Sequence, residues 1–322
     1  MQIQKTDRFL PDQVPGQNIA DQVTDFLILN FDQILDRIDA NVKTRSKYKT
    51  DAKLFIDFVS HQGLHLNTFR DYKKHLQGLT CFSTKTKRHK LISAKRLLQE
   101  LHTHYKLLTV DLTAGTKNFQ ISAEHTKDGL SADQVKSVKK IILQEADALK
   151  RSRLLALFQL LALQGLRQFE VCQMTVEDLQ LPDRIALIKG KGRDDKERID
   201  LHPDTVKALE DYLKQSGKRS GYLFTSISPA SKGEGSPLTE RAVRKLFTDQ
   251  HNGLFIRAGI AAGKSVHGLR HYFVTKLLEV TSGDLLTVQK FSRHRSLQSI
   301  RFYDDRKRKQ ELLPAYYAAF NI

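Results

Sequence analysis

The sequence predicts a mainly α-helical protein of two domains, with a small β-hairpin or sheet in the second. Its 322 residues, 40% of them apolar, are enough to form two hydrophobic cores. Apolar residues recur at helical spacing over most of the chain, which indicates amphipathic helices. The period becomes that of β-strands only between about residues 184 and 201.

The first domain is expected over residues 20–106, after an N-terminal arm at 1–19 that carries Pro11 and Pro15 without periodicity. Four amphipathic patterns follow the arm, and Gly63 is expected to end the second. The expected helix starts are Ala20, Thr44 as an N-cap, Thr68, and Ser83 or Thr84. The last pattern is the longest. These patterns predict a small helical domain.

Residues 107–128 lose the periodicity and are interpreted as a linker, so the second domain covers 129–322. Ser131 and Gln134 form a capping box that starts its first helix. Further helices are expected at about 149–164, 167–174, 203–214 and 239–258. Strands at 184–188 and 198–201 form the hairpin, with Lys189, Lys191 and Lys196 near its tip.

The charge of the chain indicates a polyanionic partner. The formal net charge is +17 and the pI is about 9.7. Between residues 41 and 106 there are 15 Lys and Arg against 4 Asp and Glu, which favours a DNA-binding surface over a merely solvated helix face. The candidate DNA-binding residues are Lys43, Arg45, Lys47, Lys85, Lys87, Arg88, Lys90, Lys95 and Arg96.

The remaining composition favours a cytosolic protein without a membrane partner. The N-terminus lacks a signal-peptide core, and the longest apolar run is too short to span a bilayer. Cys81 and Cys172 are expected to be buried thiols and not a disulfide, and their spacing predicts no zinc site.

The stretch from His267 to Tyr303 combines guanidinium, imidazole and phenol groups, which together can bind and attack a phosphate. Arg167 and Arg270 can each present a planar fork to phosphate oxygens. Tyr303 offers a nucleophile, Lys191 on the hairpin a general acid, and His267 and His294 groups that titrate near neutral pH. Taken singly, each has a structural explanation. Arg167 and Glu170, for example, fit an ordinary i,i+3 pair.

Five motifs in order resemble those of the tyrosine recombinases, the lambda-integrase-like family that includes Cre and the Xer enzymes. They are Gly165-Leu166-Arg167 with Glu170, Gly190-Lys191-Gly192, His267-Gly268-Leu269-Arg270-His271, and His294 followed nine residues later by Tyr303, with Gly129-Leu130-Ser131 at the domain entry. The resemblance implies a helical, SAM-like core-binding domain at 20–106 and an α+β catalytic domain at 129–322. The two would form a C-shaped clamp around DNA.

The resemblance also implies a mechanism. Tyr303 would attack a DNA phosphate to give a 3′-phosphotyrosyl link, and exchange would pass through a Holliday junction. Arg167 and Arg270 would clamp the phosphate, and Lys191, with Lys189 as a competitor, would be the general acid. His267 would assist proton transfer, His294 would bind the phosphate, and Glu170 and His271 would support them. No metal or other cofactor is implied.

The implied partner is double-stranded DNA with paired recombination sites. The protein would act as a homotetramer, with its tail at 308–322 docking on a neighbour; packing on its own domain is the alternative. Ser292-Arg293 stands where the family usually has Leu-Gly before the second histidine, so the motif does not predict the turn that aims His294. Two other functions use similar residues or the same fold. They are nicking and resealing by a type IB topoisomerase, and DNA binding by a regulator that does not cleave.

Overall fold

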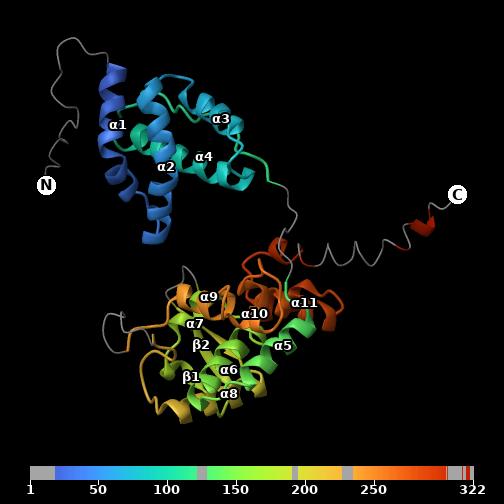
Figure 1. Cartoon of the computed structure of the whole chain (residues 1–322). Helices are drawn as coiled ribbons and strands as arrows, with labels where there is room; N and C mark the ends of the chain where they lie inside the picture. Colours follow the sequence, from blue (N-terminus) through green and yellow to red (C-terminus); the bar gives the residue numbers. More distant parts are fainter. Residues whose placement is uncertain are drawn as a thin grey trace. The chain divides into compact units, whose positions relative to one another are not determined.

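The chain divides into two compact units, residues 1–122 and 123–322 (Figure 1). The computed structural model describes residues 19–121, 129–190, 195–226, 235–301, 303, 314 and 317–319. The division falls inside the segment that was interpreted as a linker. Each unit has its own hydrophobic core, so each is described by itself.

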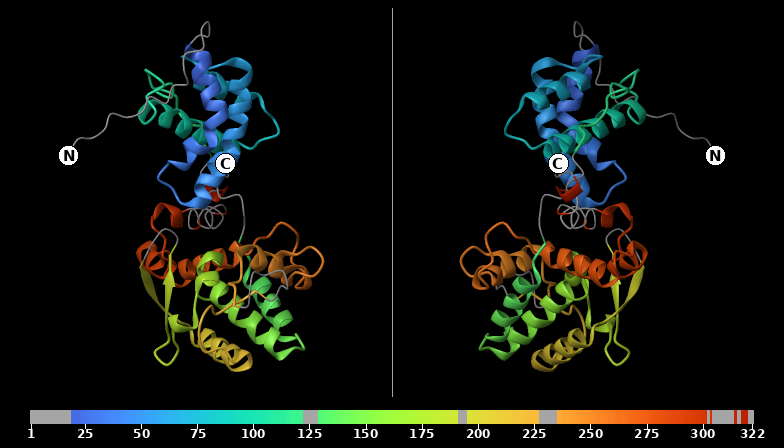
Figure 2. Two further views of the ribbon diagram at one scale, coloured as in Figure 1. Left: turned by 90° about the vertical axis from the view of Figure 1, so that its left-hand side faces the viewer. Right: turned by 90° about the vertical axis from the view of Figure 1, so that its right-hand side faces the viewer.

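The first unit is a bundle of four helices (Figures 1 and 2). They are α1 (Ile19–Asp36), α2 (Val42–Gln62), α3 (Thr68–Gly78) and α4 (Thr84–Thr103). Helix α2 packs against the other three, and α4 also packs against α1 and α3. Leu27, Phe55, Tyr72 and Leu97 are fully buried, as the helical spacing of the apolar residues requires.

Short polar side chains and one glycine set the ends of these helices. The N-cap of α2 is Asn41, whose side chain accepts a hydrogen bond from the backbone N–H of Thr44 at 2.9 Å. The prediction that Thr44 is the cap was therefore wrong by one turn, because an asparagine three residues earlier offers the better acceptor. Ser83 caps α4 as predicted, and Gly63 ends α2 with a positive φ of 69°.

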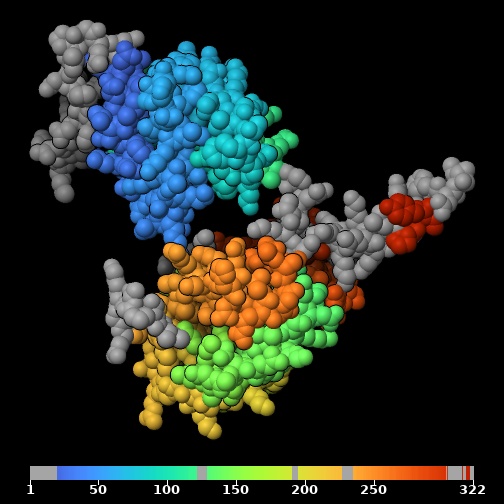
Figure 3. Space-filling view, in the orientation of Figure 1, coloured from blue at the N-terminus to red at the C-terminus, as the bar shows by residue number. Residues whose placement is uncertain are grey.

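The second unit is built around α6 (Ala148–Ala162), which is buried along nearly its whole length. It contacts α5 (Ala132–Leu143), α7 (Gln168–Gln173), α8 (Pro203–Ser216) and α11 (His267–Val280). The capping box of Ser131 and Gln134 starts α5 as predicted. The unit also contains η1 (Val176–Asp178), α9 (Glu240–Thr248), α10 (Leu254–Arg257) and α12 (Leu285–Ser292). Figure 3 shows the segment of α9 and α10 lying directly against that of α5 and α6.

In the described residues, three antiparallel strands form a sheet in the order β1 (Leu179–Gln180), β2 (Ile185–Lys189), β3 (Lys196–Asp200). The predicted hairpin is β2 and β3, with Lys189 paired to Lys196 at the end where the loop connects the two strands. Strand β1 was not predicted, because two residues carry no detectable period. Lys196 does not project from the tip, since its ammonium group pairs with the buried carboxylate of Asp178.

The predicted helix at 239–258 is two helices, so this prediction was wrong. The Asp249 carboxylate accepts hydrogen bonds from the backbone N–H groups of His251 and Asn252, which turns the chain away from the helix. Gly253 then lies against the backbone of Asp249, where a Cβ atom would come within 2.5 Å of its nitrogen. The chain therefore starts a separate helix, α10, at Leu254.

The cysteines only partly match the expectation. Cys172 is buried, but Cys81 is exposed in the connection between α3 and α4, where no core covers it. Within the described residues, no helix combines the length and the hydropathy that a bilayer crossing needs.

Candidate active site

Arg167 lies at the start of α7 and is oriented by Glu170. The backbone N–H of Arg167 donates to Glu170 Oε2, and its Nη1 donates to Glu170 Oε1, each at 2.8 Å. The carboxylate is almost fully buried, whereas the side chain of Arg167 is 34% exposed. The pair is thus not a surface pair. The carboxylate holds one edge of the guanidinium, while part of the Arg167 side chain remains exposed.

Arg270, one turn into α11, is the largest fully buried side chain of the described residues. Its Nη1 donates to the carbonyl of Gly165, and its Nη2 donates to the carbonyl of Ser292 at 2.5 Å. Burial, with help from Arg167 and against the opposing effect of Glu170, lowers the pKa of Arg270 to about 9. This side chain therefore joins the segment before α7 to the end of α12.

The turn at the end of α12 positions His294. Arg293 adopts the left-handed conformation, with φ 56° and ψ 41°, and ends the helix. The buried Ser292 hydroxyl lies 2.6 Å from His294 Nδ1, while His294 Nε2 lies 3.5 Å from Nη2 of Arg270. Gln289 Nε2 donates to the His294 carbonyl at 2.9 Å. The imidazole is thereby fixed on both of its ring nitrogens.

His294 differs from the expectation that it titrates near neutral pH. Burial, and then the positive charges of Arg270 and Arg167, lower its pKa to about 3. The ring is therefore neutral at physiological pH. It can donate or accept a hydrogen bond there, but it does not serve as an imidazolium acid.

Tyr303 lies against two imidazoles. Its ring centroid is 4.7 Å from that of His271 and 6.1 Å from that of His294. His271 in turn meets His267, the first residue of α11, edge-on at 4.9 Å. Burial raises the pKa of Tyr303, although Arg270 and Arg167 act in the opposite direction. The phenol therefore carries its proton in this state.

The structure brings most of the predicted site residues into one cluster, although they come from segments more than 100 residues apart. Arg270 contacts His294, both His294 and His271 adjoin Tyr303, and His267 adjoins His271. Arg167, held by Glu170, is near enough for its charge to act on His294 and Tyr303. Lys191 lies outside the described residues, and its competitor Lys189 is the last residue of β2.

Sequence reasoning missed Arg293, which it treated only as a departure from a motif. Its side chain is 5% exposed, and its Nη2 donates to Glu170 Oε2 at 3.1 Å. Burial would raise the pKa of the Glu170 carboxyl, but Arg293 and Arg167 together lower it by more. The only signal in the sequence is an arginine at a position that terminates a helix, where glycine is the usual residue.

The nine candidate DNA-binding residues lie on α2 and α4, and several are engaged within their own unit. Arg45 donates to the carbonyl of Asp36 at 2.8 Å, Lys47 pairs with Asp51 at 2.9 Å, and Lys87 donates to the carbonyl of Gln77 at 3.0 Å. The ammonium of Lys90 lies 4.8 Å from the centroid of the Phe82 ring. Contact with DNA by these residues stays a prediction.

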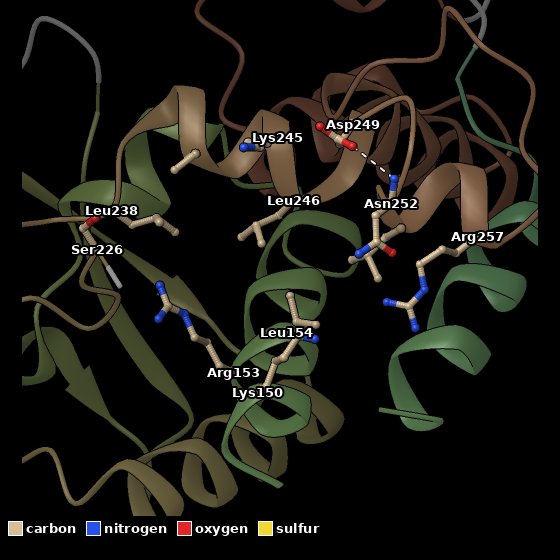
Figure 4. Close-up of a pocket in the computed structure, with 12 residues that line it drawn as sticks. Lys150, Arg153, Leu154, Ser226, Leu238, Lys245, Leu246, Asp249, Asn252 and Arg257 are labelled. Atoms are coloured by element: carbon tan, nitrogen blue, oxygen red, sulfur yellow. Dashed lines mark hydrogen bonds between the residues drawn. The ribbon is translucent and has the colours of Figure 1, made fainter. Parts of the chain in front are cut away.

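A cavity of about 390 Å³ lies elsewhere in the second unit, and none of the predicted site residues line it. Figure 4 shows Arg153 and Leu154 of α6 facing Lys245 and Leu246 of α9 across this space. Nη2 of Arg153 donates to the carbonyl of Thr225 at 2.5 Å. The cavity is therefore separate from the cluster around Tyr303.

Fold and cluster together define a helical unit with a small sheet, in which arginines, imidazoles and a phenol lie together. The model of the phage integrase family matches residues 130–310, which is more than half of the chain. The chain therefore belongs to the phage integrase family.

Named relatives in this family are tyrosine recombinases. Tyrosine recombinase slr0733 of Synechocystis is 35% identical over 167 residues, which is 51% of either chain. A Synechococcus elongatus tyrosine recombinase is 32% identical over 168 residues, so the chain spans about half the length of these two relatives. Tyrosine recombinase XerC of Halalkalibacterium halodurans is 28% identical over 268 residues, covering 80% of this chain and 84% of the relative.

Solved structures share the fold at low sequence identity. The post-cleavage complex of XerH recombinase with a palindromic difH substrate has a TM-score of 0.65 and 19% identity, and covers 96% of this chain and 90% of that one. A lambda integrase dimer bound to a COC′ core site has a TM-score of 0.64 and 17% identity, covering 87% and 94%. These likenesses agree with the predicted fold class, mainly α with a small sheet.

Proposed function

We propose that the protein is a tyrosine-type site-specific DNA recombinase, which cleaves and rejoins strands through a 3′-phosphotyrosyl intermediate. One observation carries this proposal: the phenol of Tyr303 contacts His271 in the same cluster that contains Arg167 and the buried Arg270. A phenol among fixed cations can act both as a nucleophile toward phosphorus and, once esterified, as a leaving group. Relatives named tyrosine recombinases support the same reaction.

In the proposed reaction, the Tyr303 oxygen attacks the scissile phosphorus, and the bond to the 5′ oxygen of the next nucleotide breaks. Arg167 and Arg270 bind the non-bridging oxygens and stabilise their developing charge. Because burial raises the pKa of the phenol, its proton must leave as the bond forms, and the adjoining imidazoles of His271 and His267 can accept it or pass it on. Neutral His294 donates a hydrogen bond to the phosphate from Nε2–H, with Nδ1 accepting from the Ser292 hydroxyl, in place of the long contact of Nε2 with Arg270.

The leaving 5′ oxygen needs a proton, and Lys191, which lies between β2 and β3 in the sequence, is proposed to supply it. Attack by a 5′ hydroxyl from the partner strand reverses the ester and passes the DNA through a Holliday junction. No step of this proposal uses a metal or other cofactor. The protein–DNA ester conserves the bond energy.

The proposed partners are two double-stranded DNA sites and further copies of the chain. The basic helices α2 and α4 of the first unit, a core-binding domain at about 20–106, would close a clamp on DNA with the second unit. The active assembly is proposed to be a cytoplasmic homotetramer in which the tail at 308–322 docks on a neighbouring copy. Steep weakening of DNA binding with salt would be expected from such a clamp.

The test is covalent trapping on a nicked suicide substrate that carries the cognate site. We expect wild-type protein to form a covalent DNA adduct, and Tyr303→Phe to bind the same DNA with unchanged affinity but form none. A wild type without adduct would identify a DNA-binding regulator instead. Recombinant product from a plasmid with two sites distinguishes a recombinase from a type IB topoisomerase, which would only relax it.

The role of Lys191 has its own test. Lys191→Ala should slow cleavage, and a 5′-bridging thiolate should restore the rate, because a thiolate leaves without a proton. If the thiolate gives no rescue while Lys189→Ala is rescued, the acid is Lys189.

A further inference from the structure

Arg293 occupies a position that is unfavourable for an arginine in two respects. Its φ of 56° is a left-handed conformation that glycine adopts at no steric cost and that L side chains rarely adopt. Its Nε and Nη1 atoms are buried and make no hydrogen bond in the part of the chain that the structure describes. Strained backbone and unpaired buried donors persist where a site uses the residue.

Within the described residues, the hydrogen bond of the Arg293 side chain goes to the carboxylate that orients Arg167. Glu170 Oε2 accepts from Arg293 Nη2 at 3.1 Å and from the backbone N–H of Arg167 at 2.8 Å, while Oε1 accepts from Arg167 Nη1. Both partners in this buried pair are nearly inaccessible, at 5% and 1% exposure. The carboxylate is thus held from two sides by guanidiniums of different helices.

This arrangement affects how much of the charge of Arg167 remains for a phosphate. With Arg167 alone, Glu170 would neutralise the cation that must bind the substrate. With Arg293 present, the carboxylate is shared between two guanidiniums, so it neutralises Arg167 only in part. Arg293 also fixes the turn that leads directly into His294.

We propose that Arg293 is a positioning residue for DNA cleavage, acting through Glu170 to orient Arg167 and preserve its charge for the scissile phosphate. This inference rests on the proposed recombinase function. It predicts a defect in the rate of cleavage and not in DNA affinity, because Arg293 itself is buried and does not need to touch DNA.

The test uses glycine, which the backbone at this position prefers. Arg293→Gly is compared with Arg184→Gly, because Arg184 also has a φ of 56° but is exposed in the turn before β2. On the nicked suicide substrate at saturating DNA, Arg293→Gly should cleave about 10- to 100-fold more slowly than wild type. Its DNA affinity should be unchanged, Arg184→Gly should cleave at the wild-type rate, and Arg293→Lys should recover part of the loss.

A double-mutant cycle separates positioning from a general structural effect. In a Glu170→Gln background, adding Arg293→Gly should cost less than about 3-fold in cleavage rate, since the carboxylate through which Arg293 acts is already gone. The same fold loss in both backgrounds would overturn the proposal, as would wild-type cleavage by a folded Arg293→Gly protein. If Arg293→Gly does not fold, the same double-mutant cycle is measured with Arg293→Lys, and an equal fold loss in both backgrounds would again overturn the proposal. Failure of the wild type to form an adduct would instead refute the proposed function.

Discussion

The bonds of Arg270 predict that replacing it with lysine costs both stability and activity. The carbonyls of Gly165 and Ser292 accept from two different nitrogens of the guanidinium. Lysine has one nitrogen and can reach at most one of these carbonyls at its present position. One charge-assisted hydrogen bond is lost, at about 1.5–3 kcal/mol. For a unit of this size, that lowers the unfolding temperature by roughly 3–12 °C.

Thermal unfolding followed by circular dichroism measures the first effect, and adduct formation on the suicide substrate measures the second. Cleavage by Arg270→Lys should fall about 100-fold or more, because the proposed function makes this guanidinium a fixed donor to the phosphate. The matched control is Arg198→Lys. The side chain of Arg198 is 66% exposed, and its Nη2 lies 3.7 Å from Oδ1 of Asp200, so this substitution should change the free energy of unfolding by less than about 0.5 kcal/mol. Unchanged unfolding of Arg270→Lys would refute the proposed link between the two segments. Normal cleavage by a destabilised Arg270→Lys would show that this guanidinium does not bind the phosphate.

Three further predictions follow from burial and backbone geometry. The pKa of His294 is lowered in the folded state, so the unfolded chain binds its proton first as pH falls. Urea unfolding should therefore show the free energy of unfolding of wild type falling more steeply below about pH 6.5 than that of His294→Gln. Equal dependence of the two proteins on pH would contradict this. Gly165→Ala should lower the free energy of unfolding by more than the roughly 1–2 kcal/mol of its backbone strain, because the new Cβ would lie 2.2 Å from the Phe273 ring. The control Gly217→Ala has a φ of 65° and open space around its Cβ, so it should lose only the stability that backbone strain costs. Native protein should react with maleimide at Cys81 alone, counted by mass spectrometry, and labelling of Cys172 before denaturation would contradict its burial.

Local features of the fold followed from the sequence because they depend on neighbouring residues. The capping box of Ser131 and Gln134, the end of α2 at Gly63 and the β2–β3 hairpin each lie within a few residues of the signals that predict them. The break after α9 was missed, because Asp249 competes for backbone N–H groups inside an otherwise helical pattern. Local propensity does not decide whether these N–H groups continue the helix or bond to the Asp249 carboxylate.

The members of the candidate site were predictable from their types and order, but the bonds that hold them were not. The contact between Arg270 and the Gly165 carbonyl joins residues 105 apart, and no local pattern encodes it. Arg293 was overlooked for a related reason. The family motif predicts which residue usually stands at position 293 but not what a different residue does there. The role of Arg293 depends on its contact with the carboxylate of Glu170, which the fold alone provides.

Arg270 has a structural role and a proposed catalytic role, and this affects which residues would be lost first if selection for activity were relaxed. Replacing Tyr303 with phenylalanine removes a single oxygen and keeps the ring that packs against the cluster of Val274, Leu278, Val288 and Ile300, so drift can erase the proposed chemistry at little cost to folding. Losing Arg270 would leave two carbonyl oxygens without their donor inside the core. If the proposed function holds, the arginine should therefore outlast the tyrosine among inactive descendants, and the tyrosine is the better guide to which copies retain the proposed DNA cleavage.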